Sequence, residues 1–116
     1  MEHEQRYVHL GAGAGVPPGP RQHISGESIM TKDDLLTELS TALRFPDYFR
    51  RNWDAFEECL RAVIGSPGTE PRIVQIDASA LVQSRLPAET ALLQEIWAEV
   101  SEGAPDGRVP PHLVLA

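Results

Sequence analysis

A short stretch in the middle of the chain concentrates the side chains that could do chemistry. Its charged residues follow a spacing of i, i+3, i+4 and i+7: Asp54, Glu57, Glu58 and Arg61. A helix places residues at this spacing on one face. Two of these carboxylates, those of Asp54 and Glu58, could act as an acid–base pair or bind a metal ion. Carboxylates on the solvent side of a helix normally stay hydrated, which does not favour either role. We therefore expect no enzymatic activity, no metal site and no cofactor.

The same stretch carries an apolar face on its other side. Apolar residues recur at Trp53, Phe56, Leu60 and Val63, which predicts a helix over residues 53–63. A helix anchored in a core by this face would hold its carboxylates as a rigid anionic surface, which suits a partner whose own site binds phosphate. A solvated face without a partner is the other interpretation, because charged faces are routine on surface helices.

Composition limits the class of protein. The chain has 116 residues, 41% of them hydrophobic, and a net charge of −7, which predicts one globular domain. The acidity argues against non-specific nucleic-acid binding, because neutralising phosphates requires a basic surface. It is compatible with a basic protein partner, although charge by itself favours acidity that serves solubility alone. The single cysteine, Cys59, allows no disulfide within this sequence and no thiolate metal site, and its place beside the apolar face indicates a small core residue.

The N-terminal segment differs from the rest of the chain. Residues 1–5 lack the basic and apolar regions of a signal peptide, and no run of residues is long and apolar enough to span a bilayer. Both observations predict a cytoplasmic protein. Residues 11–20 are rich in glycine and proline. We therefore interpret residues 1–19 as a flexible leader, in which residues 7–10 could form an extra strand.

Hydrophobic periodicity and helix-breaking residues define the other elements. Thr31 followed by Asp34 has the pattern of a capping box, and Pro46 stops the helix that follows them. Asp77 could cap a short helix that runs through Leu81. The predicted order is a strand at 22–25, a helix at 31–43, a helix at 53–63, a strand at 73–76, a short helix at 77–81, a helix at 87–102 and a strand at 112–115. Because helical crossovers join strands in parallel, the expected fold is α/β, with a small three-stranded parallel sheet packed with three to four helices.

The central motif and the order of elements resemble the barstar family of intracellular ribonuclease inhibitors. The motif consists of Pro46-Asp47-Tyr48-Phe49 and, after two residues, Asn52-Trp53-Asp54-Ala55-Phe56-Glu57-Glu58-Cys59-Leu60. The likeness covers residues 20–116; it is specific in this motif and depends mainly on element order in the last third. The resemblance implies a barstar-like domain at 20–116 and leaves residues 1–19 outside it.

The resemblance also implies a function and a contact surface. In the barstar family an acidic helix and the loop before it block the active site of a small microbial ribonuclease, and carboxylates take the places of substrate phosphates. Carried over by position, the partner-binding residues are Tyr48, Asn52, Asp54, Glu57, Glu58, Arg61, Ala62 and Val63. The implied partner is a small secreted ribonuclease, barnase-like or related, which a monomeric immunity protein binds as a 1:1 heterodimer. A barstar-fold interaction module with a non-nuclease partner is the alternative.

Several residues of this surface depart from the family pattern. Glu58 occupies the place of the family's central aspartate and is one methylene longer, and Glu57 replaces an interfacial tryptophan. Arg50 and Arg51 stand in the loop where the family often has small, acidic or neutral residues, so residues 45–63 hold four acids and three arginines. These arginines would repel a strongly basic cleft. A different cognate nuclease and a partner of another kind are therefore both open.

Individual residues of the stretch also have simpler interpretations. Asn52 could cap the helix through its side chain. Glu58 could form an ordinary surface ion pair with Arg61. Of the aromatic residues Tyr48, Phe49 and Trp53, we expect only Tyr48 to face a partner and the other two to pack in the core.

The histidines show no pattern typical of a functional site. Neither H-x-H nor H-E-x-x-H occurs in the sequence. We therefore expect His3, His9, His23 and His112 to be surface or strand-packing residues.

Overall fold

The computed structural model describes residues 6–11, 15–46, 50–65 and 72–116. Within these residues, four parallel strands form one sheet in the order β1-β4-β3-β2. The strands are β1 (Val8–Leu10), β2 (Arg21–Ser25), β3 (Ile73–Asp77) and β4 (His112–Leu115). The helices are α1 (Lys32–Ala42), α2 (Trp53–Gly65), α3 (Ser79–Arg85) and α4 (Pro87–Glu102), with a 3₁₀ turn at Gly26–Ser28. In this described part, no helix is both long and apolar enough to cross a membrane.

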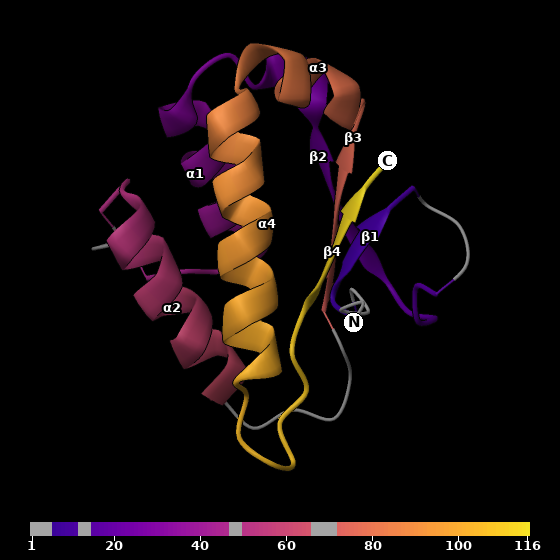
Figure 1. Cartoon of the computed structure of the whole chain (residues 1–116), viewed down its shortest axis with the longest axis vertical. Coiled ribbons are helices and arrows are strands. Elements are labelled where there is room, and N and C mark those ends of the chain that lie inside the picture. The colour runs from indigo at the N-terminus through magenta and orange to yellow at the C-terminus, as the bar shows by residue number, and fades with distance from the viewer. Residues whose placement is uncertain (1–5, 12–14, 47–49, 66–71) are drawn as a thin grey trace, which may run out of the picture.

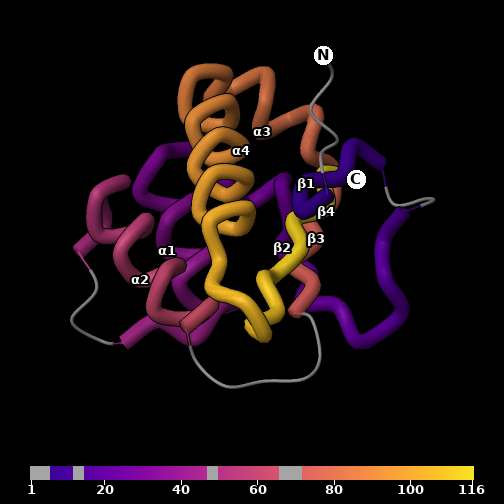
Figure 2. Tube along the Cα trace, turned by 60° about the horizontal axis from the view of Figure 1, so that its bottom comes forward, coloured from indigo at the N-terminus to yellow at the C-terminus, as the bar shows by residue number. Residues whose placement is uncertain are grey.

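The helices α1, α2 and α4 lie together on one side of the sheet (Figure 1). Of these, α2 packs against α4 and lies farther from the strands, in both Figure 1 and Figure 2. The α/β class and the parallel arrangement of the strands confirm the prediction from sequence. The outer position of α2 leaves one of its sides in solvent, and this side carries most of the predicted contact residues.

The sheet of the described residues has four strands rather than the three predicted. The strands β2, β3 and β4 correspond to the predicted ones, and β1 is the extra strand that residues 7–10 could form. It pairs in parallel with β4, with Val8 opposite Leu113. Val8 is only 3% exposed and belongs to the same hydrophobic core as the other strands. Burial of this side chain and the ladder of hydrogen bonds therefore tie the N-terminal segment to the sheet.

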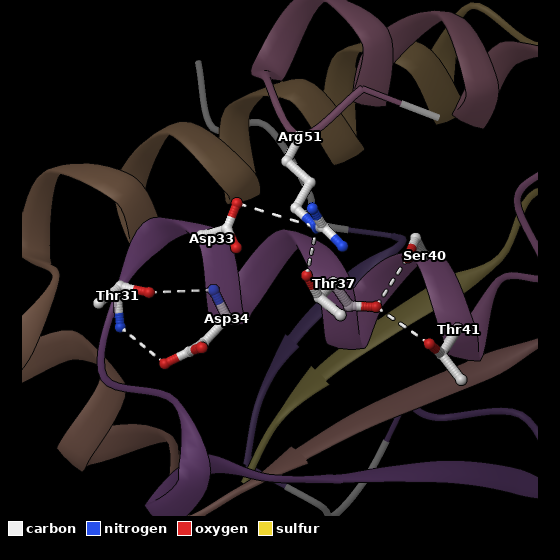
Figure 3. A network of polar contacts seen from close by, with 7 residues as sticks. All are labelled: Thr31, Asp33, Asp34, Thr37, Ser40, Thr41 and Arg51. Atoms are coloured by element: carbon white, nitrogen blue, oxygen red, sulfur yellow. Dashed lines mark hydrogen bonds and ion pairs between the residues drawn. The ribbon is translucent and has the colours of Figure 1, made fainter. Parts of the chain in front are cut away.

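The start of α1 is fixed by the predicted capping box. Thr31 Oγ1 accepts a hydrogen bond from the backbone N–H of Asp34 at 3.1 Å, and Asp34 Oδ2 accepts one from the N–H of Thr31 at 3.2 Å (Figure 3). These bonds satisfy backbone donors that the first turn of a helix leaves unpaired. At the other end, Arg44 has a left-handed backbone with φ of 56°. This conformation ends the helix before Pro46, which could not continue it.

The contact between α2 and α4 forms the centre of the core. Trp97 of α4 is fully buried, and its indole Nε1 donates a hydrogen bond to the carbonyl of Pro111 at 2.9 Å. Phe56 of α2 is fully buried too, and its ring centroid lies 6.4 Å from that of Trp97. Leu60 and Ile64 continue the buried face of α2 by one turn each. The apolar spacing seen in the sequence therefore defines the inner side of this helix.

The segment after β3 differs from the prediction. The helix α3 begins and ends later than expected, and its N-cap is Ala78, which has a left-handed backbone with φ of 53°. Asp77 does not cap it. As the last residue of β3, Asp77 directs its carboxylate to the sheet face away from the helices, where it accepts a hydrogen bond from Gln75 at 2.7 Å and pairs with His23 at 2.9 Å. Strand alternation rather than local capping decides where this side chain points.

A pair of stacked histidines occupies the same sheet face near β1. The rings of His9 and His112 have centroids 5.1 Å apart, and Nε2 of His9 lies 2.8 Å from Nδ1 of His112. Gly15 lies against the pair, because a Cβ there would be 3.6 Å from Nδ1 of His9. The chain that leads into β2 runs on this side of the sheet, opposite the helices (Figure 2). Burial lowers the pKa of both rings, with a further contribution from Arg21 at His9 and from His9 at His112.

We expect Gly26→Ala to destabilise the fold. A Cβ at Gly26 would lie 2.3 Å from the carbonyl oxygen of Asp77 and 2.7 Å from that of Ala78, and these backbone atoms cannot move aside as a side chain can. The free energy of unfolding, measured by urea denaturation, should fall by about 1–3 kcal/mol. Gly65→Ala is the matched control, because a Cβ there would have no neighbour within 4 Å. An equal loss in both variants would contradict the steric explanation.

We also expect stability to fall as the pH drops below the ordinary histidine pKa of about 6.5. The pKa values of His9 and His112 are lowered in the folded state, so the unfolded chain binds more protons in the window below about pH 6.5. The contribution of the histidine pair to the free energy of unfolding is therefore complete above about pH 6.5 and is lost as the pH falls below it. Urea denaturation at about pH 7.5 and about pH 5.5 measures the difference.

The variant His112→Gln tests whether the pair causes this pH dependence. It keeps a polar side chain and removes one of the two titrating rings, so the loss of stability between the two pH values should become smaller. Asp77 does not contribute in this window. Its pKa is lowered, first by the hydrogen bond from Gln75, so it changes stability only below about pH 3.9. An unchanged pH dependence in the variant would show that other groups cause it.

Candidate functional site

The helix α2, which carries the predicted site, starts at an asparagine cap. Asn52 Oδ1 accepts a hydrogen bond from the N–H of Ala55 at 2.8 Å, and its carbonyl accepts one from the N–H of Phe56 at 3.0 Å. The capping interpretation of Asn52 is confirmed, because its side chain satisfies a backbone donor of the first turn. Contact of Asn52 with a partner stays a prediction.

An indole hydrogen bond fixes the first turn of α2 to α4. Trp53 Nε1 donates to Oε2 of Glu89 at 2.8 Å, and the Trp53 ring meets Phe56 edge-on with centroids 5.5 Å apart. Phe45, which follows α1 in the chain, packs against Phe56 from another side, with ring centroids 5.7 Å apart. Packing of Trp53 against the core is therefore confirmed, whereas Phe49 lies outside the described residues. These contacts give the helix one defined orientation.

Two carboxylates on the outer side of α2 have no ion-pair partner among the described residues. Asp54 and Glu58 are both exposed and stand four residues apart, one turn of helix. Hydrated, unpaired carboxylates of this kind are free to meet cations of a partner.

The other two charged residues of this face neutralise each other. Arg61 Nη1 donates to Oε2 of Glu57, an i,i+4 ion pair. The sequence suggested that Arg61 pairs with Glu58, and the structure shows the partner to be Glu57. A glutamate four residues before a basic residue is the favoured arrangement on a helix, because the two side chains lie one above the other. The pair leaves Glu58 available.

The structure brings together the described members of the predicted contact set on α2 and its cap. Asn52, Asp54, Glu58, Arg61 and Ala62 are exposed, while Glu57 and Val63 are partly buried. Tyr48, the loop residue predicted to face a partner, lies outside the described residues. The predicted surface is thus continuous along one helix, and its role in binding stays a prediction.

The two loop arginines have different surroundings. Arg51 Nε donates to Oγ1 of Thr37 at 2.7 Å and lies 3.8 Å from Oδ1 of Asp33, both on α1 (Figure 3). Its charge is therefore held against the neighbouring helix. Arg50 lines a pocket that also includes Glu58. Of the two, it is Arg50 that lies in one pocket with an unpaired carboxylate, that of Glu58.

Cys59 is a packing residue rather than a nucleophile. It is a free, partly buried cysteine on α2. Burial raises the pKa of its thiol, and the neighbouring Glu58 carboxylate raises it further. The reactive thiolate is therefore disfavoured.

Sequence reasoning missed the polar groups that the sheet assembles. His9 pairs with His112 and His23 pairs with Asp77, although the partners are 103 and 54 residues apart in sequence. No local motif announces such pairs, because they form only when separate strands align. Within the described residues, no three side chains of the His, Cys, Asp and Glu types are grouped so that they could hold a metal ion.

Comparison with known proteins assigns the chain to a family. A family model described as "Barstar (barnase inhibitor)" matches residues 20–116. No match was found among curated proteins. The matched region includes α2 with its unpaired carboxylates and β2, β3 and β4, and it leaves out β1. Because the match spans most of the sequence, the chain belongs to the barstar family.

Proposed function

We propose that the protein inhibits a small microbial ribonuclease by covering its active site with the outer side of α2 and the preceding loop. The observation that carries this proposal is the pair Asp54 and Glu58: exposed, one turn apart, and without an ion-pair partner among the described residues. A ribonuclease active site must bind phosphates through cationic groups, and these carboxylates can take the places of the phosphates. The inhibitor performs no chemistry and acts in the cytoplasm, as a monomer in a 1:1 complex.

Rigidity of α2 supports this proposal. The Asn52 cap, the Trp53–Glu89 hydrogen bond and the buried Phe56 hold the helix before any partner arrives. A preorganised surface loses less conformational entropy on binding than a mobile one. The net charge of −7 would also steer a basic enzyme towards the inhibitor and raise the association rate.

A non-nuclease protein partner is the second candidate. The observation in its favour is the partial neutralisation of the acidic helix, where Arg61 pairs with Glu57 and Arg50 lies in the same pocket as Glu58. Inhibition assays on a panel of small microbial ribonucleases separate the two candidates. Inhibition of a panel member supports the first proposal, and binding of no member supports the second.

We expect Asp54→Ala and Glu58→Ala each to weaken nuclease binding by more than tenfold. Removing one partner of a buried charge pair typically costs about 2–5 kcal/mol, a range for which the barnase–barstar complex is itself a standard example. Surface plasmon resonance at low and high salt measures the effect, and the association rate of the unsubstituted protein should fall as salt rises. Unfolding curves should shift little. Neither side chain has an ion-pair or hydrogen-bond partner among the described residues, and loss of the Asp54 charge from the first turn of α2 costs at most about 1 kcal/mol.

The matched control is Glu27→Ala. Glu27 is exposed in the 3₁₀ turn, outside the predicted contact set, and its removal changes the net charge by the same amount. Binding of this variant should stay within about threefold of the unsubstituted protein, as expected for a distant exposed charge. If Asp54→Ala and Glu58→Ala bind a nuclease as tightly as this control, the carboxylates do not enter its active site.

Substitutions at Asn52 separate capping from partner contact. Asn52→Ala removes the acceptor for the N–H of Ala55 and should lower the free energy of unfolding by about 1 kcal/mol. Asn52→Asp keeps an acceptor at the cap and should retain most of that stability. Urea denaturation measures both. A capping role alone predicts that Asn52→Asp binds as well as the unsubstituted protein, whereas weaker binding by this stable variant would show direct contact with the partner.

A further inference from the structure

A pocket of about 560 Å³ lies between the end of α1 and the outer side of α2. Its charged lining consists of three arginines and one carboxylate: Arg44, Arg50, Arg72 and Glu58. Apolar groups, including those of Leu43 and Val63, make up much of the remaining wall. We call this feature the arginine pocket. It is a basic hollow in a protein whose net charge is −7.

Two of these arginines are placed by contacts at the end of α1. Arg44 directly follows the C-cap of that helix and has a left-handed backbone with φ of 56°. Arg72 Nη1 donates to the carbonyl of Leu43 at 3.2 Å, which uses one of its guanidinium N–H groups. The side chains of Arg44 and Arg50 form no hydrogen bond or ion pair with the described residues, although Glu58 lines the same pocket. Among the described residues, the pocket therefore holds three arginines and one carboxylate to compensate them.

The arginine pocket is continuous with the proposed binding surface. Glu58, Ala62 and Val63 line the pocket and also belong to the predicted contact set. A protein that covers the outer side of α2 would therefore cover the pocket as well. Removing water from guanidinium groups without supplying an opposite charge is costly, because a buried unpaired charge loses its hydration. A tight partner must bring an anion to this place.

We infer that the arginine pocket receives an aspartate or glutamate side chain of the partner protein. The partner is the ribonuclease of the proposed function, on which this inference depends. Its surface presents cations to Asp54 and Glu58 and, beside them, an acidic side chain that Arg44, Arg50 and Arg72 bind. Guanidinium groups suit this task, because their planar forks bind carboxylates through two parallel hydrogen bonds. Arg50 then selects for a nuclease with an acidic residue next to its catalytic cations and rejects one with a uniformly basic cleft.

The sign of an alanine substitution tests this inference on the nuclease complex. If the pocket binds a partner carboxylate, the double variant Arg44→Ala/Arg50→Ala should bind the nuclease at least tenfold more weakly. If these arginines only repel a basic cleft, the same variant should bind more tightly. Arg108→Ala is the matched control, because Arg108 is exposed in the turn between α4 and β4. Unchanged or tighter binding of the double variant would overturn the inference, whereas Asp54 and Glu58 could still act as proposed.

A second experiment uses no nuclease. The unsubstituted protein is titrated with the blocked tripeptide acetyl-Glu-Glu-Glu-amide at low salt, while amide chemical shifts are followed by NMR. We expect saturable amide shifts confined to the lining of the pocket, at residues 43–45, 50, 55, 58–59, 62–63 and 72, and at least a tenfold weaker response in Arg44→Ala/Arg50→Ala. A tripeptide that causes no saturable shift, or one whose binding the double variant retains, would overturn the inference. Inorganic phosphate that binds there as tightly as the tripeptide would also overturn it, since the pocket would then serve a free anion.

The two experiments distinguish failure of the inference from failure of the proposed function. If the protein inhibits no ribonuclease but binds the tripeptide in the arginine pocket, the pocket is a site for carboxylates and the assignment to a nuclease is wrong. If the protein inhibits a ribonuclease through Asp54 and Glu58 but does not bind the tripeptide, the proposed function holds and the inference about the arginine pocket is wrong.

Discussion

Burial of one side of α2 against α4 is the constraint on which the rest of the site depends. Phe56 and Leu60 are fully buried on the inner side of the helix, so the charged residues of the opposite side must remain in solvent. The Trp53–Glu89 hydrogen bond ties the start of the helix to α4. The acidic surface is thus a consequence of how the core packs, and its rigidity makes it suitable for tight binding.

Charge on this surface is patterned rather than uniformly negative. Two ion contacts, Arg61 with Glu57 and Arg51 with Asp33, hold charges close to the fold. What remains for a partner is a pair of carboxylates and an adjacent basic pocket. A pattern of both signs discriminates among partners more sharply than one sign alone, because each misplaced charge is desolvated without compensation. Under the proposed function, the departures from the family pattern, above all Arg50, would confer specificity for a particular partner.

The sheet uses its two faces differently. One face packs under α1 and α4 with apolar side chains, and the other carries the histidine pair and the Asp77 contacts. The strand β1 lies outside the region matched by the family model, yet it pairs along β4 and supplies one of the paired histidines. It covers a sheet edge that would otherwise offer unpaired backbone groups.

The sequence by itself determined the elements whose signals are local. The 3.6-residue period around Phe56 and Leu60, the capping box at Thr31 and the Asn52 cap depend on neighbours within a few residues, so they could be predicted together with the parallel α/β class. The family motif also located the carboxylates. The tertiary structure alone decided that Arg61 pairs with Glu57, that Asp77 faces across the sheet, that His9 meets His112, and that three arginines converge beside Glu58. Such contacts depend on rotamers and on strand register, which arise only when segments far apart in the chain pack together.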